Sequence, residues 1–399
     1  MQNTFSLGSR FSWTRLFSGS LMVFGTTVGA GMLGIPLMTA QGGFGAAFLA
    51  TLLVWVFMAI TGLLLLEVAL RMPRGSNFIT LSSELLGKKS KWITIFLYLF
   101  LYYALMVAYF SGGSPLLGLG LSSLGLSLSS GQEIAFFAVF FGGIVALGAR
   151  FIDKTNAVLS LGMLILFPLI IFLGKGDVCV DRLLAKPLTF SIAAIPILFG
   201  AFGYHNIIPS LTQYLGSDKK ALRISIILGT FLAFVLYVIW QWFVLGALSL
   251  QALTDVLSQG LPVTYALAQG GHPHIFVLGQ TFAFFALTTS FLGVSFSLVD
   301  FIQEALGKRK HFNRRIYAIL LALIPPLVCV ALDPHLFDRA LGVAGGIGES
   351  LLNGIYPVLL FFLIHKGQQG PMKMGKKLFL SALFLFSLFV MGIEIRHLL

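Results

Sequence analysis

The stretch at residues 25–36, Gly25-Thr26-Thr27-Val28-Gly29-Ala30-Gly31-Met32-Leu33-Gly34-Ile35-Pro36, decides the fold of this chain. It lies in the middle of the first long apolar run, and its four glycines and one proline disfavour an unbroken helical hydrogen-bond ladder. Inside a bilayer, unpaired backbone is tolerated only where protein buries it or where it lines a cavity. The stretch therefore predicts a broken membrane helix, whose ends offer N–H groups to a carboxylate and carbonyls to a cation or an ammonium group. A glycine-rich packing face without a ligand is the alternative.

Composition indicates an integral membrane protein. Of the 399 residues, 57% are hydrophobic and only 10% are charged, and the mean hydropathy is +0.95. Soluble domains carry about a quarter charged residues. Apolar runs fill nearly the whole length, so we expect a single membrane domain over residues 1–399. The first run continues past Pro36 without a cleavage-site pattern, which favours a membrane span over a cleaved signal.

Eleven spans are expected, each close to the ~20 residues that cross a bilayer. Two further segments, 77–87 and 251–271, predict short helices at the inner and outer surface, respectively. The approximate bounds of the spans are 17–40, 45–70, 92–113, 133–149, 156–174, 189–215, 222–248, 274–305, 314–332, 340–365 and 376–396.

The basic residues predict the orientation. If the N-terminus lies inside, 21 of the 26 Lys and Arg residues fall in inner segments and 5 in outer ones. Because cytoplasmic loops carry an excess of Lys and Arg, the N-terminus is expected in the cytoplasm and the C-terminus on the outer side. This distribution accounts for the net charge of +12 without a nucleic-acid partner.

A second break is expected in span six, where residues 196–210 read PILFGAFGYHNIIPS. Prolines flank a centre that contains Gly200, Gly203, His205 and Asn206. A matched pair of interrupted helices points to the central site of a transporter. Coincidence is the alternative, since glycine and proline are frequent in membrane helices.

The two breaks lie five spans apart, and an odd offset inverts the orientation of the second set of spans. We therefore expect two repeats of opposite topology, at about 17–174 and 189–365, followed by an extra helix at about 376–396.

Three stretches resemble motifs of the hydroxy/aromatic amino acid permease family, which belongs to the amino acid–polyamine–organocation superfamily. They are 25–36 (GTTVGAGMLGIP), 202–214 (FGYHNIIPSLTQY) and 289–300 (TSFLGVSFSLVD). The likeness covers essentially the whole chain and is closest to tyrosine-specific permeases, with tryptophan permeases next. It implies an all-α fold of eleven helices in a five-plus-five inverted repeat, with helices 1 and 6 broken. It also implies proton-driven uptake of an aromatic amino acid across the bacterial inner membrane.

The breaks and the resemblance together suggest how the zwitterionic end of the substrate would bind. The N–H groups at residues 29–31 are expected to hold the α-carboxylate, and carbonyls on both breaks the ammonium group. An apolar slot with one or two polar groups would take the aromatic ring. Tyr102 and Tyr109 share one face of span three, and Tyr109 is the stronger candidate. The residues expected at the substrate are Thr26, Thr27, Gly29, Ala30, Gly31, Tyr109, Ala201, Phe202, Gly203, Tyr204, His205 and Asn206.

Few ionisable residues lie within the spans. Glu349, in the sequence Gly345-Gly346-Ile347-Gly348-Glu349-Ser350, is expected near the middle of span ten and is the leading proton carrier, with His205 next. We expect Glu67, Asp300 and Glu304 to form interfacial ion pairs.

Sodium coupling is an alternative. In sodium-coupled relatives of this fold, hydroxyls on span eight hold the ion, and Thr289 and Ser290 would correspond to them. Hydroxyls in membrane helices more often bond to their own helix. Span five has no lysine to replace sodium, which places one version of proton coupling in doubt.

Rival classes of function find little support. An intramembrane enzyme needs a catalytic pair, a metal cluster or a cofactor motif, and a nucleotide-driven pump needs a P-loop. Neither Cys179 nor Cys329 has a partner motif, so no metal or cofactor is expected, and whether the two pair is left open. A channel predicts rings of like charge, which are not visible. The choice among tyrosine, tryptophan, phenylalanine and a small hydroxy amino acid is left open, as are the coupling ion and the oligomeric state.

Overall fold

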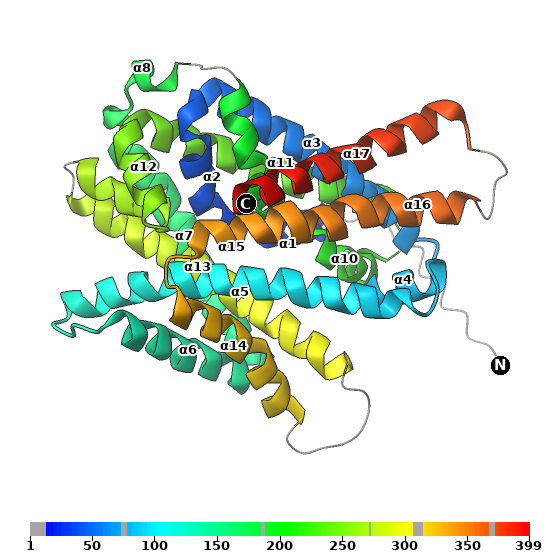
Figure 1. Ribbon diagram of the computed structural model, residues 1–399, viewed down its shortest axis with the longest axis horizontal. Coiled ribbons are helices and arrows are strands. Elements are labelled where there is room, and N and C mark those ends of the chain that lie inside the picture. Colours follow the sequence, from blue (N-terminus) through cyan, green and yellow to red (C-terminus); the bar gives the residue numbers. More distant parts are fainter. Residues whose placement is uncertain are drawn as a thin grey trace.

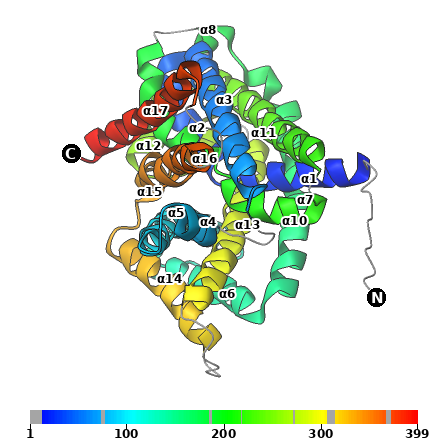
Figure 2. The ribbon, with the colours of Figure 1, turned by 90° about the vertical axis from the view of Figure 1, so that its right-hand side faces the viewer.

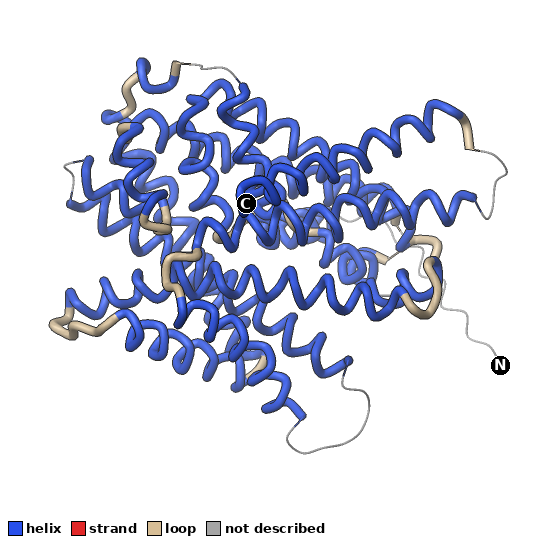
Figure 3. Tube along the Cα trace, viewed as in Figure 1, coloured by secondary structure: helices blue, strands red, loops and turns tan. Residues whose placement is uncertain are grey.

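The structure is a computed structural model that describes residues 13–72, 78–184, 188–216, 218–270, 273–305, 314–366 and 372–399. These residues form helices joined by short loops, and no strand occurs among them (Figure 3). The first half of the chain contains α1 (Trp13–Thr27), α2 (Gly31–Thr39), η1 (Ala40–Gly42), α3 (Gly43–Ala69), α4 (Phe78–Leu85), α5 (Ser90–Ser123), α6 (Ser130–Leu147), α7 (Ala149–Gly174), η2 (Lys175–Asp177) and α8 (Val180–Leu183). The second half contains η3 (Leu188–Ala194), α9 (Ile195–Ala201), η4 (His205–Ile207), α10 (Ile208–Leu215), α11 (Lys219–Ala247), α12 (Leu250–Ser258), η5 (Val263–Gly270), α13 (Pro273–Ala305), α14 (Arg314–Leu332), α15 (Phe337–Val343), η6 (Ala344–Ile355), α16 (Tyr356–Lys366) and α17 (Met374–Leu398).

The long helices run roughly along the longest axis of the molecule (Figure 1). Among the described residues, ten helical stretches are long and apolar enough to cross a membrane. One of them, Gly31–Ala69, has 39 residues, about 58 Å at 1.5 Å per residue, and a bilayer core is about 30 Å thick. Gly43, with φ of 66°, separates α2 from α3 within that stretch. Counting α1 with α2 as the first crossing gives the eleven crossings that the sequence predicts.

Both predicted breaks are present. In the first crossing, α1 ends at Thr27 and α2 begins at Gly31. In the sixth crossing, α9 ends at Ala201, and a short turn of 3₁₀ helix, η4, precedes α10. The prediction that crossings 1 and 6 are broken is confirmed. Their offset of five crossings is the one an inverted repeat requires, while the bounds of the two repeats stay a prediction.

The third crossing is longer than its sequence suggests. We expected this span to be about 92–113, but α5 continues to Ser123, so the predicted end was too early. The helix passes through the glycines at 112 and 113, which make room for aromatic rings. A Cβ on Gly112 would lie 2.7 Å from the Phe337 ring, and one on Gly113 would lie 2.8 Å from the Phe137 ring.

The tenth crossing changes its winding in the middle. Between α15 and α16, residues Ala344–Ile355 form a π-helix, which is rare and often marks a functional site. This segment packs on α9 and carries Glu349. The sequence analysis expected a span at about 340–365 and did not predict the π-helix.

The surface segments are helical, as expected. The segment 77–87 contains α4, and the segment 251–271 contains α12 and η5, none of which is long enough to span. Cys179 and Cys329 are both free and exposed. In the end-on view of Figure 2, α6 and α14 lie toward one edge of the bundle and α3, α11 and α17 toward the opposite one. The broken helices α2 and α9 pack against each other between these groups.

Candidate functional site

A cavity of about 630 Å³ lies where the two breaks meet. Its walls come from both breaks and from α5, α7, α11, α13, α15 and the π-helix η6. Its lining includes Phe24 of α1, Asn156 and Ser160 of α7 and Ser297 of α13. The volume is within the usual range of about 300–1,000 Å³ for small-molecule sites.

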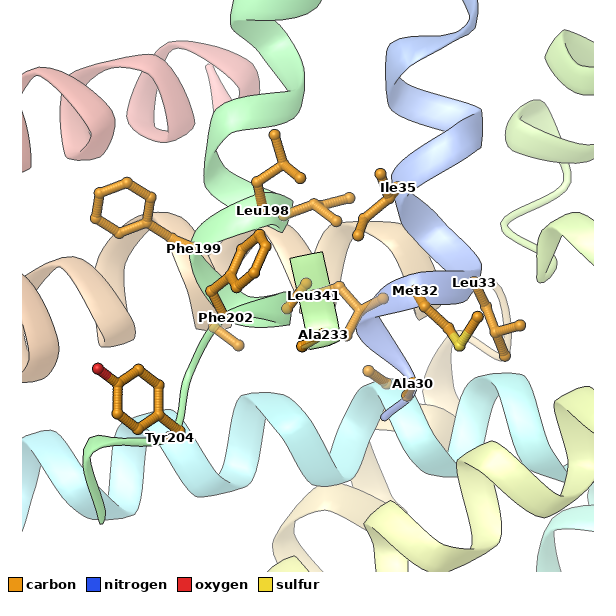
Figure 4. Packing of buried hydrophobic residues seen from close by; sticks show 14 of the residues in the cluster. Ala30, Met32, Leu33, Ile35, Leu198, Phe199, Phe202, Tyr204, Ala233 and Leu341 are labelled. Carbon is orange, nitrogen blue, oxygen red and sulfur yellow. The ribbon is translucent and has the colours of Figure 1, made fainter. Parts of the chain in front are cut away.

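Direct contact between the broken helices shapes the cavity. A Cβ on Gly31 would lie 2.8 Å from both Cα and Cβ of Ala201, so the start of α2 touches the end of α9. Figure 4 shows Ala30 and Phe202 at the facing ends of these helices, with Leu341 between them. Glycine is needed at position 31 because any side chain would push the two helices apart.

The first break faces the cavity, and every residue from Phe24 to Met32 lines it. The Ala30 N–H donates to Ser290 Oγ at 3.2 Å. The hydroxyl groups of Thr26 and Thr27 donate to carbonyls within their own helix, at 2.9 Å and 2.8 Å. The predicted residues Thr26, Thr27, Gly29, Ala30 and Gly31 all line the cavity.

The second break divides its residues between two sides. Ala201, Gly203 and Asn206 line the cavity, whereas Phe202 and Tyr204 are fully buried and do not. The Tyr204 hydroxyl donates to the Met58 carbonyl on α3 at 3.1 Å. In Figure 4 the Tyr204 ring points away from α2.

His205 also faces α3 and lies outside the cavity lining. Its Nε2 lies 3.0 Å from Thr61 Oγ1, and its ring packs against the Tyr204 ring at an interplanar angle of 35°, with centroids 4.7 Å apart. Its Nδ1 has no hydrogen-bond partner among the described residues. The structure therefore separates His205 from the groups that a substrate in the cavity would touch.

Glu349 lies in the cavity wall, although its side chain is only 5% exposed. The Asn353 amide, one turn further along the π-helix, donates a hydrogen bond to its carboxylate. On the other side, the carboxylate lies directly against Gly203 of the second break. A buried carboxylate and an irregular backbone segment are thus in contact, and Glu349, the residue that the sequence favours as proton carrier, lies at the cavity.

Replacing Gly203 by alanine tests this contact. The added methyl group would overlap the Glu349 carboxylate and should displace it. We expect uptake of an aromatic amino acid, the substrate that the resemblance implies, to fall about tenfold. Gly25→Ala is the matched control, because Gly25 lines the same cavity and a Cβ there meets nothing within 4 Å. Uptake by both variants, normalised to folded protein, checks the prediction. Equal uptake by the two would contradict it.

The remaining wall combines aromatic and polar side chains. Tyr102 and Tyr109 of α5 both line the cavity, as predicted from their shared face. Asn156, Ser160 and Met163 of α7 were missed by the sequence analysis. Their spacing of four and three residues puts them on one face of a helix, and this polar stripe in an apolar span was a readable signal. Other lining residues that were missed include Tyr98, Phe282, Ser297 and Asn353.

The two hydroxyls considered for sodium have different environments. Thr289 Oγ1 donates to carbonyls of its own helix, at Phe285 and Ala286, with distances of 2.9 Å and 3.0 Å. Ser290 instead points to the first break and accepts from Ala30. Both line the cavity, and of the two only Ser290 is hydrogen-bonded to the first broken helix.

The other ionisable residues of the spans lie away from the cavity. Glu67 forms an ion pair with Arg223 on α11, as expected of an interfacial carboxylate. Asp300 is exposed near the end of α13. The side chain of Glu304 lies outside what the structure describes.

Comparison with known protein families gives a match over nearly the whole chain. The sequence profile of the tryptophan/tyrosine permease family matches residues 13–397. The chain is 33% identical over 388 residues to "Tyrosine-specific transport system 1" of Haemophilus influenzae, which covers 94% of each chain. It is 31% identical over 342 residues to "Tryptophan-specific transport protein" of Pseudomonas aeruginosa, which covers 83% of this chain and 82% of that one.

Solved structures show a similar fold. The crystal structure of MhsT in complex with L-phenylalanine matches with a TM-score of 0.61, over 97% of this chain and 99% of that chain. At 14% sequence identity this likeness concerns the fold alone. It agrees with the predicted class, an all-helical membrane protein with broken helices 1 and 6.

Proposed function

The chain belongs to the tryptophan/tyrosine permease family, and from this we propose that it imports an aromatic amino acid, tyrosine in first place, by symport with protons. Its family and relatives are permeases, which agrees with the prediction that it is not an enzyme. The observation that carries the proposal is the cavity of about 630 Å³, in which two broken helices and a buried carboxylate meet.

The zwitterionic end of the substrate would bind between the two breaks. The N–H groups at Gly29, Ala30 and Gly31 would receive the α-carboxylate, and glycine at 29 and 31 lets it approach the chain closely. The Ala30 N–H donates to Ser290 Oγ, so a carboxylate oxygen would replace a neutral acceptor by a charged one. The carbonyls of Thr27 and Ala201 would accept hydrogen bonds from the ammonium group. No ionised side chain is required at either end.

The aromatic ring would lie among the cavity residues of α5, α7 and α13. Tyr109 and Phe282 offer ring surfaces, and Asn156, Ser160 and Asn206 offer polar groups that could meet a phenol hydroxyl or an indole N–H. Both kinds of substrate need an apolar slot with a few polar contacts. The identity of 33% to a tyrosine-specific system supports tyrosine over tryptophan, which is the second candidate.

Glu349 is the group we assign to proton coupling. Its carboxylate is almost completely buried, lines the cavity and touches the second break through Gly203. Ionisable residues inside a membrane are costly and commonly belong to proton or substrate pathways. A change in the protonation of Glu349 would act directly on the backbone that faces the substrate. His205 lies outside the cavity lining, so we assign it to support of α9 and not to proton coupling.

Alternating access would proceed by movement of one repeat against the other around this site. The repeats are those predicted at about 17–174 and 189–365, within one transport domain. We place the protein in the bacterial inner membrane, with the C-terminus in the periplasm.

Uptake into proteoliposomes tests the proposed function. Purified protein is reconstituted, and labelled tyrosine is supplied under a proton gradient alone or a sodium gradient alone. We expect accumulation with the proton gradient alone, inhibited by unlabelled tyrosine, tryptophan or phenylalanine and not by serine. Accumulation that requires sodium would overturn proton symport and move the coupling site to Ser290 and its neighbours. If no amino acid is taken up under either gradient, the assignment of substrate fails.

A further inference from the structure

Tyr237 of α11 joins the ends of the two broken helices from behind the cavity. Its hydroxyl lies 2.8 Å from the carbonyl oxygen of Thr27 and 2.8 Å from that of Ala201. The side chain is fully buried and is not part of the cavity lining, whereas Thr27 and Ala201 both are. Tyr237 therefore touches the same two carbonyls that a ligand would reach from the opposite side.

Two carbonyl oxygens share one hydroxyl group as hydrogen-bond donor. A phenol has a single hydrogen, so it can donate fully to only one of the two carbonyls at a time. The other carbonyl is left in a buried setting without a full hydrogen bond, which is unfavourable. A group that brings further N–H donors from the cavity would correct this shortage. An ammonium group has three such donors and a positive charge that suits two converging carbonyl dipoles.

We propose that Tyr237 is a positioning residue that holds the Thr27 and Ala201 carbonyls together so that they bind the α-ammonium group of the substrate. The proposal rests on the function proposed above and adds a residue that the sequence analysis did not consider. Because each carbonyl oxygen has two lone pairs, the ammonium group can donate to both carbonyls while Tyr237 donates to one of them. In the empty site it links α1 to α9, and hence the two halves of the fold.

The surroundings of the phenol fix its position. The Phe202 ring packs against it nearly at right angles, with centroids 5.1 Å apart and an interplanar angle of 77°. One turn further along α11, the Gln241 amide donates to the Tyr237 carbonyl at 3.3 Å. This gives Phe202 a role: it was expected at the substrate, and instead it supports the tyrosine that faces the two carbonyls.

Binding of three related ligands to the purified protein tests the proposal. L-tyrosine has both charged groups, tyramine has only the ammonium group, and 3-(4-hydroxyphenyl)propionate has only the carboxylate. In Tyr237→Phe we expect tyrosine and tyramine to bind about tenfold more weakly, because the two carbonyls are no longer held in place for the charge-assisted hydrogen bonds from the ammonium group. Binding of the propionate should change by less than about twofold, because it does not use these carbonyls.

Tyr204→Phe is the matched control. Tyr204 is also fully buried in the second break, and its hydroxyl donates to a single carbonyl, that of Met58, away from the cavity. It should leave the ratio of tyrosine to propionate binding unchanged. If Tyr237→Phe does not fold, Phe202→Leu keeps the hydroxyl and loosens its position, and a smaller change of the same ratio is expected.

The pattern of ligand binding in the two tyrosine variants decides between a positioning role and a purely structural role for Tyr237. A selective loss of the two ammonium ligands supports the positioning role. An equal loss for all three ligands, or the same pattern in Tyr204→Phe, would mean that Tyr237 only stabilises the fold, and the proposal would be overturned while the proposed function stands. Failure of the wild-type protein to bind tyrosine, phenylalanine or tryptophan would overturn both.

Discussion

Proteoliposomes that contain Glu349→Gln are expected to lose all proton-driven accumulation of tyrosine, while the exchange of internal for external tyrosine continues. Glutamine has nearly the same shape, and Asn353 can still donate to its amide oxygen. It cannot bind and release a proton, so the link between the proton gradient and the substrate is lost. Accumulation under an imposed proton gradient and exchange without one are measured on the same preparation.

Glu67→Gln is the matched control for this variant. Glu67 is an acidic residue of the second crossing, and it pairs with Arg223 away from the cavity. A partly exposed ion pair contributes little to stability, about 0–1 kcal/mol, so this variant should accumulate tyrosine like the wild type. If Glu349→Gln still accumulates tyrosine against its gradient, Glu349 is not the coupling group.

Gly345→Ala is expected to have the largest effect on folding. A Cβ at Gly345 would overlap the Pro196 carbonyl oxygen and lie 2.6 Å from the Gly200 backbone nitrogen. Both atoms belong to the backbone of α9, so neither can move aside as a flexible side chain would. Forcing π-helix η6 away from α9 should cost about 3 kcal/mol or more, in line with the upper range for overpacked cores.

The control for this prediction is Gly392→Ala on α17, where a Cβ meets nothing within 4 Å. Alanine also favours helix over glycine, so this variant should be as stable as the wild type or slightly more so. Thermal unfolding in detergent and the yield of monodisperse protein measure both variants. Equal melting temperatures for Gly345→Ala and the wild type would contradict the close contact between η6 and α9.

Much of the architecture could be predicted because its signals are local. The stretches 25–36 and 196–210 each concentrate glycines and prolines near the middle of a span, and each predicted break is present in the structure. The π-helix at Ala344–Ile355 was missed, since its sequence is as apolar and glycine-rich as an ordinary membrane helix. The end of α5 was missed because the glycines there serve packing with distant rings, which only the fold brings near.

The direction of side chains in the second break could not be predicted. Phe202, Gly203, Tyr204, His205 and Asn206 were expected at the substrate as one group. Irregular backbone has no period of 3.6 or 2, so sequence spacing does not say which side chains share a face. In the structure Gly203 and Asn206 face the cavity, and the three rings face the bundle.

The Glu349–Asn353 pair could be predicted from the sequence, whereas the contacts of Tyr237 could not. Asn353 lies four residues after Glu349, a spacing that puts it beside the carboxylate on a helix, so the pair was predictable. Tyr237 is 210 residues from Thr27 and 36 from Ala201, and no local pattern links these positions. Its contacts with both carbonyls follow only from the packing of α11 against α1 and α9.

The movement of protons with the substrate tests the central claim most directly. Wild-type proteoliposomes are loaded with a pH-sensitive dye, the membrane potential is clamped, and tyrosine is added outside without any imposed pH gradient. We predict that the lumen becomes acidic as tyrosine enters, and that Glu349→Gln liposomes show no such change. Entry of tyrosine into wild-type liposomes without acidification would contradict proton symport and the role assigned to Glu349.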